Sequence, residues 1–545
     1  MHLACCVVTA GITLAVGAAA GRAQDAQEKP MIRCEVVDAQ SGKPLPARVY
    51  VRSADGKWFF ARSASAEGSA VAYRKQRFAT SVEMHTTVSA HPFVVDVPAG
   101  RYTVTVERGK EYLPAERAVE VTRAPARVRI ALRRWIDMAA AGWYSGDTHV
   151  HRSIEELGNL LLAEDLNVGL PLTYWVTTAY TPPAKGNKGA AKRPPAECIH
   201  VDATHVIYPV NTEYEIFSTA GKRHTLGAVM IIGHKAPFTA GVPPVKPVAE
   251  QARREGALLD LDKHSWPWSL MVAAVMKVDL FELANNHVWR TEFGFRGWTI
   301  ETAPAYMKLQ RDERGLTEWG WIDFGFQTYY ALLNCGFRMR PSAGTASGVH
   351  PVPLGFGRVY VHVPGDFTFE KWMKALGAGR SFVTTGPMLT VKVGGRPPGA
   401  AIGKKADEDL SCRVTGLACG AVPLRPIEIV VNGRVVERID PANRRTDRGG
   451  CESPIETSVK LTGSSWIAVR AFEDRPDGRV RFAHSSPVHV EVPGRPLRPR
   501  REEVDYLLGR VSQELQRNRP VLRPEGLEEY AEALRIYGEI ARHAR

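Results

Sequence analysis

The stretch WYSGDTHVHRS, from Trp143 to Ser153, places two histidines one residue apart in a run that is typical of a β-strand. In an extended strand, residues i and i+2 point to the same face, with Cα atoms about 6 to 7 Å apart. His149 and His151 can therefore converge on one cation. A metal site needs three or four ligands, so the pair alone is equally compatible with an ordinary surface strand. Further ligands have to come from elsewhere in the chain.

The chain around this stretch is long enough for several domains. It has 545 residues, 44% of them hydrophobic; single domains usually hold about 100 to 200 residues, so three or four are expected. The first residues, MHLACCVVTAGITLAVGAAAGRAQ, contain an apolar run from Leu3 to Ala20 followed by small residues. This pattern predicts a signal peptide over residues 1–23 and an exported protein. A transmembrane anchor is not expected, because Thr and Gly dilute a run already at the lower limit of spanning length.

Charge and cysteine content exclude some classes of protein. The net charge of +13 is partly concentrated in two Pro-punctuated segments, 182–197 and 493–503, which are typical of solvated loops. The sequence has no basic motif interleaved with aromatic residues, so nucleic acid is not an expected partner. Six cysteines after the leader are too few for a dense disulfide framework. Cys412, Cys419 and Cys451 share one region, and we expect one disulfide among them with its pairing left open.

Turn signals and apolar periodicity divide the remainder into four segments. Residues 31–134 alternate as short strands and predict a β-sandwich; DAQSGKPLPARVYV and VPAGRYTVTVERGKEY resemble the carboxypeptidase regulatory-like modules of exported enzymes, with an expected role as a spacer. Residues 135–387 mix apolar strands with helix-like stretches and predict an α/β core. Short strands return over 388–493, as in an Ig-like β-sandwich, and residues 502–545 read as two amphipathic helices.

Polar residues end several apolar strands of the predicted core. NTEYEIF places Glu213 and Glu215 on one face, and His224 in KRHTLGAV opens the next apolar run. LLDLDKHSWPW ends at His264, and FELANNHVW ends at His287. Because α/β barrels assemble their sites from side chains at successive strand ends, these residues are the candidate partners of the histidine pair.

These motifs resemble a known family. GDTHVH is similar to the first motif of the polymerase and histidinol phosphatase (PHP) metallohydrolases. The succession NTEYE, RHTLGA, KHSWP, FELANNH and RPSAGTASGVHP, closing with GRSFVTTGPML, resembles the CehA/McbA branch of that superfamily over roughly 140–390. The resemblance implies a distorted β/α barrel with a di- or trinuclear metal site, which hydrolyses phosphoesters or, in some members, ester and carbamate bonds.

The resemblance also implies roles for individual residues. Five of them would be metal ligands, with Glu213 bridging two ions: His149, His151, Glu213, His224 and His264. Glu215 competes with Glu213 for the bridge, and His234 is an alternative to His224. Three residues would support the ligands: Asp147, Glu215 and Asn286. Zn²⁺ or Mn²⁺ suits such imidazole and carboxylate ligands, and Fe²⁺ is a further option.

Two departures from the family pattern reduce the expected metal count. Tyr174 and Trp175 stand where the family commonly has Asp-His, and the last motif offers Thr345 and Ser347 in place of an Asp. These departures remove the ligands of a third ion and one ligand of the first, which leaves one or two ions. His350 compensates in part if its loop folds inward.

The implied activity is metal-assisted hydrolysis of a small-molecule or cell-surface ester. His287 and His350 are candidates to protonate the leaving group, while Arg338 and Lys235 are candidates to neutralise an anionic substrate. The alternative is a degenerate, non-catalytic relative that binds polysaccharide, a cell surface or a protein and keeps a metal for structure. Ser-His-Asp catalysis has no GxSxG motif to support it.

Overall fold

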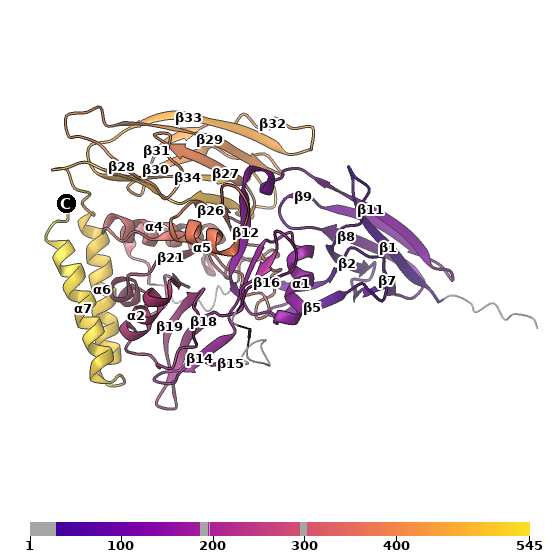
Figure 1. The fold of residues 1–545 in the computed structure, drawn as a ribbon, viewed down its shortest axis with the longest axis horizontal. Coiled ribbons are helices and arrows are strands. Elements are labelled where there is room, and N and C mark those ends of the chain that lie inside the picture. Colours follow the sequence, from indigo (N-terminus) through magenta and orange to yellow (C-terminus); the bar gives the residue numbers. More distant parts are fainter. Residues whose placement is uncertain (1–28, 186–193, 196, 295–301) are drawn as a thin grey trace, which may run out of the picture.

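The computed structural model describes residues 29–185, 194, 195, 197–294 and 302–545. Within them the chain forms several β-sheets, an α/β core and a pair of C-terminal helices (Figure 1), which confirms the multidomain α/β class. The predicted leader, residues 1–23, lies outside the described residues. In the described part of the chain, every helix is too short or too polar to span a bilayer.

The N-terminal module packs two sheets around one apolar core (indigo in Figure 1). The sheets have the orders β4-β7-β1-β11-β9 and β10-β8-β2-β6-β5, with β3 beside β2. In β8, Tyr102, Val104 and Val106 are buried at alternate positions, as a half-buried strand requires. The strands are β1 (Met31–Asp38), β2 (Ala47–Ser53), β3 (Trp58–Phe59), β4 (Arg62–Ser63), β5 (Ala70–Gln76), β6 (Val82–Val88), β7 (Phe93–Asp96), β8 (Gly100–Glu107), β9 (Tyr112–Leu113), β10 (Ala115–Val121) and β11 (Ala126–Arg134).

The core strands belong to two sheets. One begins β16-β17-β13-β12-β25-β26, and the other has the order β15-β14-β18-β19-β20-β21-β24. Hydrogen bonding among the described residues therefore does not close these strands into one barrel. The strands are β12 (Trp143–Val150), β13 (Val168–Pro171), β14 (Tyr174–Thr178), β15 (Ala184–Lys185), β16 (Ile199–His200), β17 (Val206–Ile207), β18 (Thr212–Thr219), β19 (Lys222–Ile232), β20 (Leu258–Leu261), β21 (Leu280–Ala284), β24 (Arg340–Ala343), β25 (Arg358–His362) and β26 (Ser381–Thr384).

Packing of helix α5 explains the glycine of the opening stretch. Trp372 of α5 is fully buried, and its Nε1 donates to the carbonyl of Tyr144 at 2.9 Å. A Cβ on Gly146 would lie 2.5 Å from the Trp372 ring, so only glycine fits there. The longer core helices are α1 (Ile154–Ala163), which Ser153 caps through Glu156 N, α2 (Lys246–Glu255), α4 (Glu318–Asn334) and α5 (Phe369–Gly377); α3 (Ser269–Val272) is a single turn.

The C-terminal strands continue the core sheet across the predicted boundary at residue 388. β26 pairs with β35, and the sheet runs on through β34, β30 and β31 to reach twelve strands with β28 and β36. The facing sheet has the order β27-β29-β33-β32. The spacing of short apolar runs and turns predicted these strands, but it did not predict which strands pair with one another. Their bounds are β27 (Met388–Val393), β28 (Ala401–Gly403), β29 (Ser411–Gly420), β30 (Ile427–Val431), β31 (Arg434–Ile439), β32 (Arg444–Arg445), β33 (Cys451–Lys460), β34 (Ser465–Phe472), β35 (Phe482–Ser485) and β36 (Val488–Glu491).

The expected disulfide in this region is absent: Cys412, Cys419 and Cys451 are all free thiols. In the register of β29 and β33, Cys419 lies opposite Glu452 and Cys451 lies opposite Gly420. Because successive side chains of a strand point to opposite faces, Cys419 and Cys451 project from opposite faces of the sheet. Strand pairing thus separates thiols that the sequence places in one region.

The two C-terminal helices, α6 (Arg501–Asn518) and α7 (Pro524–Ala541), pack on the core (yellow in Figure 1). Glu529 of α7 accepts from the backbone N–H groups of Val245 and Lys246, where α2 begins and lacks a side-chain cap. The Tyr537 hydroxyl donates to the carbonyl of Leu270 at 2.8 Å. The tail is therefore part of the folded core.

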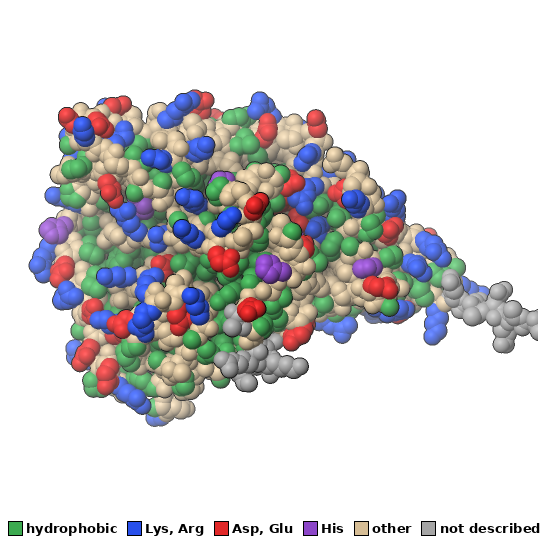
Figure 2. All heavy atoms as spheres, in the orientation of Figure 1, with side chains coloured by type: hydrophobic (Ala, Val, Ile, Leu, Met, Phe, Trp, Pro, Cys, Tyr) green, Lys and Arg blue, Asp and Glu red, His purple; other side chains and the backbone are tan. Residues whose placement is uncertain are grey.

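The face drawn in Figure 2 has no continuous basic patch, because Lys and Arg side chains are interspersed with Asp and Glu. Many of the basic residues lie in ion pairs, for example Arg413 with Glu456 and Arg535 with Glu539. Such exposed pairs contribute little stability, about 0 to 1 kcal/mol each.

A buried histidine makes the stability of the fold depend on pH. His484 accepts from the Tyr330 hydroxyl and donates to the carbonyl of Ser485, and burial lowers its pKa to about 3. The unfolded chain takes up a proton near pH 6.5 that the folded chain excludes, so stability falls as pH drops below 6.5, by up to about 1.4 kcal/mol per pH unit. We expect His484→Gln to have a shallower dependence of its urea midpoint between pH 6.5 and 4. His543→Gln, at an exposed position, should keep the wild-type dependence; equal slopes in wild type and His484→Gln would contradict this assignment.

Candidate metal centre

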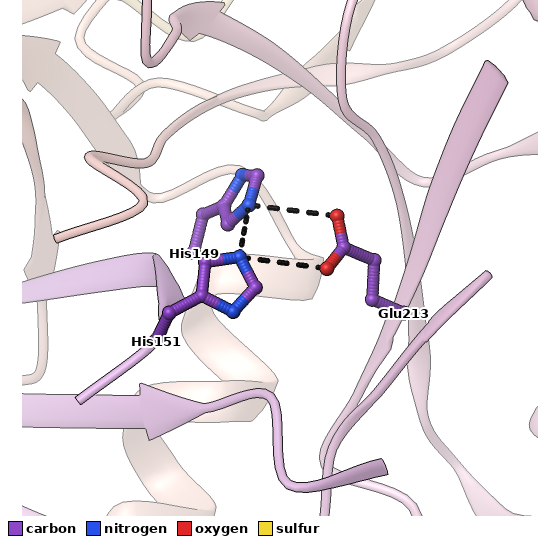
Figure 3. A group of neighbouring side chains, drawn as sticks. All are labelled: His149, His151 and Glu213. Atoms are coloured by element: carbon purple, nitrogen blue, oxygen red, sulfur yellow. Dashed lines mark hydrogen bonds and ion pairs between the residues drawn. The ribbon is translucent and has the colours of Figure 1, made fainter. Parts of the chain in front are cut away.

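The end of β12 delivers both histidines of the opening stretch to a buried cluster with the start of β18. His149 is 1% exposed, His151 6% and Glu213 0%. The two imidazoles and the carboxylate point toward one another (Figure 3). The strand alternation that predicted a shared face for the histidines thus brings them to a carboxylate from another sheet.

The separations within this group match those of metal ligands. The two Nε2 atoms are 3.1 Å apart, His149 Nε2 is 3.7 Å from Glu213 Oε1, and His151 Nε2 is 3.4 Å from Glu213 Oε2. Ligand atoms placed tetrahedrally about 2.0 to 2.2 Å from a zinc ion are about 3.3 to 3.6 Å from one another. The three side chains can therefore bind one ion and leave a fourth position open, as in catalytic zinc sites.

The other nitrogen of His149 faces a second acidic group. His149 Nδ1 is 3.3 Å from Glu282 Oε2 and 3.6 Å from Asp262 Oδ1. Both carboxylates are buried, from β21 and from the end of β20. A proton on Nδ1 that points to a carboxylate fixes the ring and leaves Nε2 for a metal. These three residues form the second group of the described chain that can hold an ion.

Lys263 lies beside this second group, and its ammonium offsets part of the negative charge of the two carboxylates. Its ammonium is 2.5 Å from Asp262 Oδ2, which also accepts from Trp266 Nε1 at 3.2 Å. Burial opposes the charged form, but Asp262 and Glu282 raise the pKa of Lys263 above its ordinary value. Burial and the Asp262 charge raise the pKa of Glu282 well above its usual range. The cluster therefore holds closely spaced carboxylates that repel each other and favour a cation among them.

Two histidines predicted as ligands lie elsewhere. His224, near the start of β19, has its Nε2 2.6 Å from Asn518 Oδ1 in α6 and belongs to neither of the two groups that can hold an ion. The alternative, His234, has Nε2 on Thr212 Oγ1 and Nδ1 on the Ala236 carbonyl. Both nitrogens of His234 are thus used within the fold, and burial lowers its pKa to about 4.

His264, the third remaining ligand candidate, lies in an aromatic environment. Its ring centroid is 4.9 Å from that of Trp321 and 4.5 Å from that of Phe324, and burial lowers its pKa to about 3. Neither nitrogen has a hydrogen-bond partner among the described residues. Neither of the two metal-binding groups includes it.

Of the residues predicted to act on substrate, His287 and His350 are buried and Arg338 is exposed. His287 stacks on Trp321 at 4.6 Å, and His350 Nδ1 is 3.2 Å from Arg77 Nη1. Burial, followed by the charge of Lys263, holds the pKa of both rings well below the ordinary range. At neutral pH both rings are therefore neutral. Arg338 is 53% exposed and pairs with Glu491 on the surface, so it does not reach the cluster.

The predicted supporting residues have different partners from those expected. Among the described residues Asp147 has no imidazole partner; it accepts from the backbone N–H groups of His149, Thr345 and Gly355. Glu215 accepts from Trp175 Nε1 at 3.0 Å. Asn286 is buried, and its side-chain oxygen has no hydrogen-bond partner in the described chain.

The family departures also have a structural outcome. The Thr345 hydroxyl, which stands where the resemblance leads us to expect an Asp, donates to Asp147 Oδ2 at 2.5 Å. It anchors its loop to β12. Tyr174 is buried in β14, with its ring 6.2 Å from that of His234. Neither residue supplies a carboxylate to the cluster.

Sequence reasoning missed Asp262, Lys263 and Glu282. The two motifs that contain them, LLDLDKHSWPW and FELANNHVW, were interpreted through their histidines, His264 and His287. The available signal was a carboxylate inside an otherwise apolar strand, because Glu282 is the one charged residue of β21. Buried carboxylates need a partner, such as a cation or a metal, and this rule would have marked it.

Comparison of the chain with protein-family models, with curated proteins and with solved structures gave no match.

Proposed function

We propose that the protein is a metal-dependent hydrolase with one divalent ion held by His149, His151 and Glu213. The observation that carries this proposal is the convergence of two Nε2 atoms and one carboxylate, all buried, at separations of 3.1 to 3.7 Å. Two nitrogens and one oxygen suit Zn²⁺, Mn²⁺ or Fe²⁺. An ion so held would acidify a bound water and polarise the ester bond under attack.

We favour one ion over two because of Lys263. The second group offers His149 Nδ1, Asp262 and Glu282, but the Lys263 ammonium already lies on Asp262. A neutral His149 has one nitrogen for a metal, and its Nδ1 faces two carboxylates. Glu282 and Asp262 therefore orient the His149 ring, and Lys263 takes the place of a second cation.

His287 and His350 lie in the loops that follow β21 and β24. Burial and the Lys263 charge favour their neutral forms. His287 can therefore take a proton from a nucleophilic water and return it to the leaving group, whereas Nδ1 of His350 already accepts from Arg77. The aromatic wall of Trp321, Trp289 and Phe324 around the histidine rings reduces access of bulk water.

The kinship with the CehA/McbA branch of the PHP superfamily, its distorted barrel and export remain part of this proposal. Motif order supports the kinship, and Glu213 lies beside the histidines of the first motif, as the resemblance implies. Proximity of β12 and β24 across the two sheets supports the barrel: Thr148 Oγ1 is 3.2 Å from the Ala343 carbonyl. The leader pattern of residues 1–23 supports export.

The test combines metal analysis with a substrate panel. Protein stripped by a chelator is reloaded with Zn²⁺, Mn²⁺ or Fe²⁺, metal is counted by mass spectrometry, and hydrolysis of chromogenic phosphodiester, phosphomonoester, carboxylester and carbamate substrates is followed. We expect about one ion per chain, and turnover that the chelator abolishes and metal restores. Protein that binds no metal would overturn the proposal.

A second function would follow from stoichiometric metal without turnover in the panel. That result would support the non-catalytic alternative, a metal-stabilised binding module. The hydroxyl of Thr345, which bonds to Asp147 in place of a ligand carboxylate, is the observation that favours it.

A further inference from the structure

A pocket of about 370 Å³ lies where residues of the N-terminal module, the core and the C-terminal strands meet. Its wall holds six lysine and arginine side chains and four carboxylates. Small-molecule sites usually have volumes of about 300 to 1,000 Å³, so the pocket is large enough for a small ligand. The described residues of the two groups that can hold an ion do not line it, so it is separate from the metal centre.

The carboxylates of the wall are taken up by two of its arginines. The pairs are Arg48 with Glu107 and Glu164, and Arg475 with Glu473 and Asp477. In contrast, Lys110 and Arg358 hydrogen-bond to backbone carbonyls and to no carboxylate of the described chain. The wall therefore carries positive charge that the folded chain leaves without a partner of opposite sign.

Lys110 lies in the turn between β8 and β9, beside an aromatic ring. Its Nζ donates to the carbonyl of Thr385 at 2.9 Å and is 3.9 Å from the centroid of the Phe356 ring. An ammonium has three donors, so two remain for a ligand. Burial, followed by the charges of Arg358 and Arg481, holds the pKa of Lys110 well below its ordinary range. An anion beside Lys110 would stabilise the charge that its present surroundings disfavour.

Arg481, immediately before β35, contacts the same ring from the C-terminal strands. It is 5% exposed, and its Cζ is 4.9 Å from the Phe356 centroid. Nη1 donates to the carbonyl of Val480 and Nη2 to that of Arg290, whereas Nε makes no hydrogen bond in the described chain. Because the cationic groups of Lys110 and Arg481 both lie against one ring, a single small anion can contact both.

Arg358 contributes charge to this wall but few donors. The side chain is 1% exposed, and its Nε donates to the carbonyl of Gly355 at 2.6 Å. Nη1 and Nη2 donate to the carbonyls of Asp165 at 3.0 Å and Glu164 at 3.1 Å. A buried charge is costly unless it is paired with one of opposite sign, so an anion in the pocket would reduce the cost of burying Arg358.

We propose that the pocket binds a small organic carboxylate, with Lys110 and Arg481 donating to its oxygens and Arg358 adding charge. Carboxylates form strong hydrogen bonds with both ammonium and guanidinium groups. The rings of Tyr112 and Phe356 line the same pocket, which favours an organic ligand over an inorganic ion. The N-terminal module, which we expected to be a spacer, then supplies one of the binding residues.

The test is calorimetry on the full chain with succinate as the probe and succinamide, its neutral diamide, as the comparison. Succinate should bind more tightly than succinamide, and Lys110→Gln should weaken succinate binding by about tenfold to a hundredfold. A glutamine can still donate to the Thr385 carbonyl, so this change mainly removes the charge. The control is Lys43→Gln, because Lys43 is an exposed lysine of the same module; it should bind succinate as the wild type does.

A second variant blocks the pocket and keeps every charge. Ala421 is a half-buried residue of the wall, and Ala421→Leu puts an isobutyl group in place of a methyl group there. It should also weaken succinate binding, at a melting temperature without ligand close to that of the wild type. Ala421→Leu with wild-type affinity, equal affinities for succinate and succinamide, or sulfate that binds as tightly as succinate would overturn the inference.

Metal removal shows whether the anion binds to this pocket or to the metal centre. Protein stripped by a chelator, and His149→Ala, should bind succinate with the affinity of the untreated wild type. Succinate binding that disappears with the metal would overturn the inference. Wild type that binds metal and hydrolyses esters but does not bind succinate overturns the inference alone. Lys110-dependent succinate binding in a protein that takes no metal overturns the proposed function alone.

Discussion

Replacing His149 by alanine should remove the metal and, with it, all metal-dependent turnover. His149 is the one residue shared by both groups that can hold an ion. The change deletes one of three ligand atoms and leaves Glu282 and Asp262 without the imidazole between them and the ion. Loss of a hydrogen-bonding partner of a ligand alone usually costs about 10- to 100-fold in metal affinity, so we expect a loss of more than about a hundredfold. Competition with a chromogenic chelator measures it.

The matched control for this experiment is His224→Ala. It makes the same chemical change at a histidine whose ring lies against Asn518 of α6. Metal affinity should stay at the wild-type value, with at most a modest loss of stability from the missing hydrogen bond. A His149→Ala protein that keeps stoichiometric metal, or a well-folded His224→Ala protein that loses it, would refute the assignment of ligands.

Asp147→Ala should cause the largest loss of stability among the changes considered. The carboxylate is fully buried and accepts from three backbone N–H groups and from the Thr345 hydroxyl. Each buried donor left without a partner costs about 1 to 3 kcal/mol, so the free energy of unfolding should fall by about 3 kcal/mol or more. Urea unfolding followed by tryptophan fluorescence measures this change.

The graded comparison is Asp147→Asn, which keeps one acceptor oxygen in nearly the same volume. We expect a loss of stability between wild type and Asp147→Ala, because the amide group faces donors on its other side. Metal affinity should follow the same order, since Asp147 holds the loop of Thr345 against β12. An alanine variant as stable as wild type would show that these hydrogen bonds contribute no net stability.

Local patterns explain why part of the fold and site could be predicted. The period of two at the end of β12 predicted His149 and His151 on one face, and NTEYEIF predicted a strand with Glu213 and Glu215 on one face. Amphipathic spacing likewise predicted the helices of the tail, observed at Arg501–Asn518 and Pro524–Ala541. These properties depend on residues within one element, so no long-range information was needed.

Partner identity was harder to predict, since it depends on the packing of distant elements. Nothing near His224 indicates that Asn518, 294 residues further along the chain, occupies its Nε2. The disulfide expected in the C-terminal strands failed in the same way, because the register of β29 and β33 turns Cys419 and Cys451 to opposite faces.

The amino-acid sequence of WYSGDTHVHRS is sufficient to make two histidines available to one ion, because side-chain direction along a strand follows from backbone geometry alone. The tertiary structure decided everything that surrounds that pair: Glu213 as the third donor, Glu282 and Asp262 behind His149, Lys263 beside them, and Arg77 from another module. The reason is physical. A site of this kind requires charges buried at contact distance, and only the packing of sheets and modules determines which charged side chains share that space.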